Sequence, residues 1–179
     1  MTGRLLAYTA LLALSGAVFA VLAIFTWRRR SGAGAIYFAL AMTAISFWAV
    51  SALVGQLSND LTTKLFWAKA TYLGIVLVPL GWIGFGLAYT GRSRYLTLRN
   101  LATLSVHPVL TLISVWLNPY RVFYRTIGLD VTGMIPTLTF ELGPIFWLHT
   151  AYSYIVLLTG AYLLLRAHLR GPSIYRRQV

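Results

Sequence analysis

Five long apolar stretches, separated by short polar segments, account for most of the chain. A transmembrane helix needs about 17–25 apolar residues at a rise of about 1.5 Å per residue, and each stretch meets that length. The pattern therefore predicts an all-α membrane protein, a five-helix transmembrane bundle forming a single domain over residues 1–179. The expected spans are 5–26, 35–57, 66–90, 101–117 and 145–165, with one longer loop at 118–144.

The third stretch carries most of the internal detail. Aromatic residues near both of its ends are typical of a helix held at two water–lipid boundaries. Pro79 in this stretch and Pro108 in the fourth each remove a backbone hydrogen-bond donor, so a helix bend is expected at both. Small residues recur on one side of the third helix and predict a close packing seam at Gly74, Gly81 and Gly84.

The long loop has a different pattern. Residues 137–142 alternate between polar and apolar side chains, and they follow a turn-forming segment that ends at Gly133. Alternation around a glycine turn predicts a small β-hairpin, which we expect to lie over the helix ends.

Composition agrees with the pattern of spans. Apolar residues make up 59% of the chain and charged residues 10%, and the mean hydropathy is +0.75. A soluble domain is nearer half apolar and a quarter charged, so a soluble protein is excluded. A signal peptide is an alternative interpretation of residues 5–26, but that run is too long and its stronger basic cluster follows it.

The basic residues predict the orientation. The net charge of +12 favours membrane topology and contact with an anionic inner leaflet, with no nucleic-acid partner. With the N-terminus outside and the C-terminus inside, inner segments hold ten of the fifteen basic residues, as the positive-inside rule requires. We therefore expect a multi-pass protein of a cell membrane, and a prokaryotic plasma membrane as its location.

Catalytic residues are scarce. The chain has three acidic residues and no cysteine, which leaves little material for acid–base or thiol chemistry. No phosphate-binding loop, nucleophile motif or zinc spacing is present, so we expect no enzyme activity and no cofactor. His107, His149 and His168 are expected at different depths, which predicts no metal site.

Lys69 is the most unusual charge because it lies about one turn inside the third span. Its stem can carry the ammonium group to the interface, which is the simpler interpretation. The alternative is an outward-facing ligand pocket, since ionisable groups within a membrane often mark functional sites. The residues predicted to line that pocket are Trp67, Lys69, Tyr72, Glu141, Trp147 and His149.

A series of short motifs resembles one family from end to end. The matching motifs are Trp27-Arg28-Arg29-Arg30 with Gly32-Ala33, Phe47-Trp48-Ala49-Val50, Phe66 to Gly74, Val78-Pro79, Ala88 to Arg92, Gly143 to His149, Tyr152-Ser153-Tyr154 and Tyr175 to Gln178. With these motifs the chain is similar to the N-terminal seven-transmembrane region of membrane-bound sensor histidine kinases. One departure is that Tyr120-Arg121 follow Asn118-Pro119, where such proteins tend to have histidines.

The resemblance implies a membrane-embedded sensory input module for signal transduction in a two-component system. It also implies that the full protein would add two further spans and a cytoplasmic kinase output, which this chain lacks. The expected partners are an unknown small ligand, the lipid bilayer, and a homodimer mate or cytoplasmic signalling partner. A small membrane transporter or scaffold subunit is the alternative function.

Overall fold

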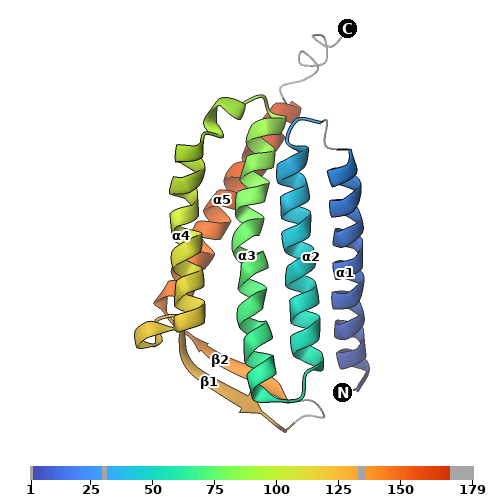
Figure 1. Cartoon of the computed structure of the whole chain (residues 1–179), viewed down its shortest axis with the longest axis vertical. Helices are drawn as coiled ribbons and strands as arrows, with labels where there is room; N and C mark the ends of the chain where they lie inside the picture. The colour runs from blue at the N-terminus through green and yellow to red at the C-terminus, as the bar shows by residue number, and fades with distance from the viewer. Residues whose placement is uncertain (1, 30–31, 133–135, 170–179) are drawn as a thin grey trace.

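In the part of the chain that the structure describes, the fold is a bundle of five long helices with a two-stranded hairpin across one end (Figure 1). The computed structural model describes residues 2–29, 32–132 and 136–169. All five helices are long and apolar enough to cross a membrane, as the hydrophobic pattern predicts. They are α1 (Thr2–Arg28), α2 (Ala35–Leu57), α3 (Leu61–Tyr89), α4 (Leu98–Leu117) and α5 (Pro144–Leu169), with short 3-10 turns η1 (Ser93–Tyr95) and η2 (Pro119–Arg121).

Capping side chains start α3 and α4 earlier than their apolar stretches. α3 begins at Leu61 because the Asp60 carboxylate accepts a hydrogen bond of 2.7 Å from the Thr63 backbone N–H. α4 begins at Leu98, where the Thr97 hydroxyl accepts from the Asn100 N–H. Hydropathy locates the membrane-buried part of a helix, whereas capping side chains extend it into the polar segment before it.

The Asp60 cap makes a pH-dependent prediction. Its hydrogen bonds to Thr63 hold the pKa of this carboxyl below its ordinary value. A carboxyl with a lowered folded-state pKa stabilises the fold above its unfolded pKa, and loses that contribution as the pH falls through the folded value. We expect Asp60→Ala to lower the unfolding temperature in detergent at pH 7, with the difference shrinking at acidic pH. A difference from wild type that stays constant with pH would contradict this role.

Helix α3 is the centre of the bundle. Figure 1 shows α2 on one side of it, α4 on the other and α5 behind, while α1 lies beyond α2. α1 and α2 pack through a cluster of Ala23, Ala41 and Met42. The Ser46 hydroxyl of α2 also donates a 2.8 Å hydrogen bond to the Gly16 carbonyl of α1.

The three glycines of the predicted packing seam all face α2. Gly74 lies against Ala44 and Trp48, and Gly81 lies against the backbone of Ala41. Gly84 lies against the ring of Tyr37. A methyl group at any of these positions would overlap α2, so the absence of a side chain allows the two helices to approach closely.

Both in-helix prolines are buried within continuous helices. α3 runs through Pro79, and α4 runs through Pro108. The bends expected at these residues stay predictions.

The predicted hairpin is present. Strands β1 (Tyr124–Asp130) and β2 (Thr137–Leu142) pair antiparallel, with Ile127 opposite Phe140. The predicted turn at Gly133 lies outside the described residues. Figure 1 places the hairpin across the bundle where α4 ends and α3 and α5 begin, which we call the hairpin end.

Candidate functional site beneath the hairpin

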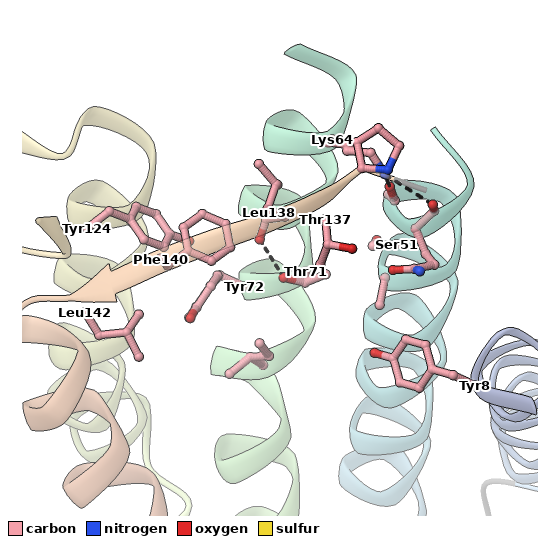
Figure 2. Close-up of a pocket in the computed structure, with 16 residues that line it drawn as sticks. Tyr8, Ser51, Lys64, Thr71, Tyr72, Tyr124, Thr137, Leu138, Phe140 and Leu142 are labelled. Carbon is pink, nitrogen blue, oxygen red and sulfur yellow. Dashed lines mark hydrogen bonds between the residues drawn. The ribbon is translucent and has the colours of Figure 1, made fainter. Parts of the chain in front are cut away.

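A cavity of about 300 Å³ lies at the hairpin end, between the hairpin and helices α2 and α3. Figure 2 shows β2 crossing over α3 towards α2, with side chains from both helices below the strand. This volume is at the lower end of the range for small-molecule sites. The residues around it come from five elements: Tyr8 of α1; Ser51, Ala52, Gly55 and Gln56 of α2; Lys64, Ala68, Thr71, Tyr72 and Ile75 of α3; Tyr124 of β1; and Pro136, Thr137, Leu138, Phe140 and Leu142 on or beside β2.

Asn118 fixes the position of the hairpin over this cavity. It ends α4 in the left-handed conformation, with φ of 43°. Its side-chain oxygen accepts hydrogen bonds of 3.1 Å from the backbone N–H groups of Phe123 and Tyr124. Its side-chain nitrogen donates to the Tyr124 carbonyl at 2.9 Å. One side chain therefore holds the start of β1 against the end of α4.

Aromatic packing supports the same arrangement. Val115, Phe123 and Tyr124 form a buried cluster, and Tyr72 of α3 packs against it. The Tyr72 and Phe123 rings meet edge to face with centroids 5.0 Å apart, and the Tyr124 and Phe140 rings lie 4.9 Å apart. Such pairs stabilise beyond the burial of their area, so the roof of the cavity is packed on the helix bundle.

Two hydroxyl groups beside the cavity lack hydrogen-bond partners in the described part of the chain. They are the Ser51 Oγ and the Tyr124 phenol oxygen, and their residues are 1% and 2% exposed. Figure 2 shows these residues on opposite sides of the cavity, with Tyr72 between them in this view. Burial raises the pKa of the Tyr124 phenol, and so does the neighbouring Tyr72 hydroxyl, which can accept a long hydrogen bond from it, so the phenol stays neutral. Buried polar groups are normally paired, so the Ser51 hydroxyl is available to a ligand, whereas the Tyr124 phenol has Tyr72 as an alternative acceptor.

Lys64 supplies the one positive charge among the described residues that line the cavity. The residue is 3% exposed, and its Nζ donates hydrogen bonds of 3.2 Å to the carbonyls of Gly55 and Gln56. These carbonyls lie in the last turn of α2, where the helix dipole favours a cation. The ammonium group is thus held at the cavity by backbone groups.

The six residues predicted to bind a ligand do not all meet at this cavity. Tyr72 is the one among them that lines it. Lys69 donates from Nζ to the Trp116 carbonyl at the end of α4, at 3.2 Å, and Trp67 packs beside Gly55. Glu141 and Trp147 are exposed, and His149 is buried elsewhere, between α4 and α5. A ligand-binding role for these residues stays a prediction.

Sequence reasoning missed Ser51, Lys64 and Tyr124. Lys64 is assigned to the loop because the third helix is predicted to begin at residue 66. An N-cap at Asp60 would instead place Lys64 in the first turn of that helix. In the sequence, Ser51 cannot be distinguished from other small residues of a membrane helix. Tyr124 likewise cannot be distinguished from other aromatic residues of a loop. Their convergence depends on where the hairpin docks.

The expectation that the histidines lie apart was wrong for two of them. The His107 and His149 rings stack with centroids 5.6 Å apart, and the Thr111 hydroxyl lies 3.3 Å from the His149 Nδ1. The reason is the register of α4 and α5, which places Thr111 beside His149 and lets the Tyr152 hydroxyl donate to the Leu104 carbonyl. No cluster of three metal-ligating side chains occurs within the described ranges, and the predicted absence of a metal remains untested.

These features define a multi-pass helical membrane protein with a hairpin-covered cavity. A family model described as the N-terminal 7TM region of histidine kinase matches residues 11–179, so the chain belongs to that family. The resemblance inferred from the short motifs is thereby confirmed. Neither curated proteins nor solved structures give a match. The family is a membrane sensory input region and not itself catalytic.

Proposed function

We propose that this chain is a membrane-embedded sensory input module that detects a small ligand in the cavity beneath the hairpin. The observation that carries the proposal is this 300 Å³ cavity, where two buried hydroxyls have no partner in the described part of the chain. A convergent set of polar groups in a largely apolar pocket is the usual form of a ligand site. Family membership supports a sensory role.

The distribution of basic residues gives the sensor a direction. Arg28, Arg29, Arg92, Arg94, Arg99 and Arg166 lie at or near the helix ends opposite the hairpin. By the positive-inside rule, that end faces the cytoplasm and the anionic inner leaflet. The hairpin and the N-terminus then face outward, so the ligand enters from outside and the output lies inside.

Helix α3 connects the two ends. Its first turns line the cavity, and its last residue, Tyr89, lies at the opposite end of the bundle (Figure 1). A ligand that binds one arrangement of α2, α3 and the hairpin more tightly than another shifts the population towards it. Small helix shifts of this kind are a common way to move a signal across a bundle. The receiving partner is a cytoplasmic kinase output or a second copy of the chain.

The proposal predicts that filling the cavity abolishes ligand recognition. Ala52 lines the cavity from α2, whereas Ala151 is exposed on α5. We expect ligands that raise the unfolding temperature of the wild-type chain in nanodiscs to bind Ala52→Trp at least about tenfold more weakly, since the indole occupies their volume. Ala151→Trp is the matched control and should respond as wild type does. Equal responses of both variants would place the ligand site elsewhere.

The same ligand distinguishes a sensor from a transporter. Reconstituted liposomes carrying the protein are expected to show no ligand flux above that of empty liposomes. Flux that Ala52→Trp blocks would identify the chain as a transporter instead.

A further inference from the structure

We propose that the cavity binds an organic anion with an apolar body, and that the Lys64 ammonium holds its anionic group. The inference rests on the proposed sensory function and names the chemical class of its ligand. It follows from the charge of the cavity, the free hydrogen-bonding capacity of its polar groups, and the separation of polar and apolar residues along it.

The charge of the cavity is positive. Lys64 lines it, and none of the lining residues that the structure describes is acidic. Glu141 belongs to β2 but alternates with Phe140 and Leu142, which face the cavity, and it is exposed. The Asp60 carboxylate caps α3 through Thr63, and its charge also acts on Lys64 from outside the cavity. The ammonium group bonds to two backbone carbonyls rather than to that carboxylate. A cation among the described cavity residues without a carboxylate among them is costly, and an anionic ligand lowers that cost.

A free donor accompanies this charge on α2. Lys64 has three N–H donors, and the described residues supply acceptors for two of them, both at the end of α2. Ser51 precedes Gly55, whose carbonyl accepts from the ammonium group, by four residues, so it lies about one helical turn further along α2 and also lines the cavity. The Tyr124 phenol lines the cavity from the hairpin, on the side opposite Ser51 (Figure 2). The ammonium group and the Ser51 hydroxyl donate hydrogen bonds, which matches the oxygens of a carboxylate or phosphate.

The apolar residues define the rest of the ligand. Ala68 and Ile75 follow Lys64 by one and three turns on the same face of α3. Phe140 and Leu142 of the hairpin line the cavity as well. An occupant with its charged group at Lys64 therefore places an apolar body against these side chains.

The test compares a carboxylate with its uncharged analogue. 4-Phenylbutyrate and 4-phenylbutanol are titrated by calorimetry into the full chain in zwitterionic nanodiscs, with empty nanodiscs subtracted. We expect the carboxylate to bind at least about tenfold tighter than the alcohol, and Lys64→Gln to remove this difference. Lys69→Gln removes the same charge from the same helix, but its ammonium bonds to the Trp116 carbonyl outside the cavity. The Lys69→Gln variant should therefore keep the wild-type preference for the carboxylate over the alcohol.

Each other outcome counts against a defined part of the proposal. Equal binding of acid and alcohol to the wild type overturns the anion assignment, whether or not Lys64→Gln folds. If Ala52→Trp still blocks the alcohol in that case, the ligand cavity stands. If Ala52→Trp changes the binding of neither compound, or neither binds the wild type, the proposed function fails as well.

An anionic lipid headgroup presents the same chemistry from the bilayer. Repeating the titration in nanodiscs that contain phosphatidylglycerol separates the two sources. An unchanged affinity for the carboxylate supports a soluble anion. Competition by the lipid that disappears in Lys64→Gln would assign the Lys64 site to a headgroup and overturn the soluble ligand.

Discussion

Replacing Asn118 by alanine is expected to lower the free energy of unfolding by about 3 kcal/mol. The amide makes three hydrogen bonds to the start of β1, and the substitution removes them all. Phe123 and Tyr124 are 0% and 2% exposed, so their backbone N–H groups lose their Asn118 acceptor inside the protein. Each buried group left unpaired costs about 1–3 kcal/mol. Alanine also adopts the left-handed backbone of this position less readily than asparagine.

Two further variants separate the loss of the amide hydrogen bonds from the change in backbone preference. Asn118→Gly restores the backbone freedom but not the amide, and should still lose about 2 kcal/mol if the hydrogen bonds dominate. Asn100→Ala at the other end of α4 removes an exposed bond to the Tyr95 carbonyl and should cost less than about 1 kcal/mol. Unfolding in detergent micelles measures all three. A loss at Asn118→Ala no larger than at Asn100→Ala would mean that the amide does not hold the hairpin.

Gly74→Ala is expected to destabilise the bundle by about 3 kcal/mol, at the upper end of the range for overpacking. A Cβ at this position would lie 2.9 Å from the Trp48 Cβ and closer still to the Ala44 carbonyl oxygen. Because the second obstacle is backbone, α2 as a whole has to move away from α3. Both helices line the cavity, so the shift should also weaken any ligand bound there.

Gly32→Ala is the control for this substitution. No atom lies within 4 Å of the Cβ that it would add, so its effect should stay within about 0.5 kcal/mol. Alanine raises intrinsic helix propensity at Gly74 by up to about 1 kcal/mol. A Gly74→Ala protein as stable as wild type would therefore show that the contact with α2 costs no more than about 1 kcal/mol.

The elements of the fold could be predicted from local patterns. An apolar run long enough to cross a bilayer must satisfy its backbone internally, and within one segment a helix is the structure that does so. Alternation over Thr137 to Leu142 similarly predicts the second strand of the hairpin. The helix starts at Leu61 and Leu98 were less accessible, because they depend on single capping hydrogen bonds at Asp60 and Thr97.

The sequence by itself determined the five spans, the hairpin and the family, since each is encoded by residues close together in the chain. The tertiary structure alone decided the candidate site. Ser51, Lys64 and Tyr124 come from three elements, and they line one cavity because Asn118 docks the hairpin and the α3 glycines bring α2 close. The pairing of His107 with His149 follows likewise from the register of α4 and α5. Hydropathy records how deep a residue lies but not which helix it faces, so contacts between helices stay hidden until the helices are packed.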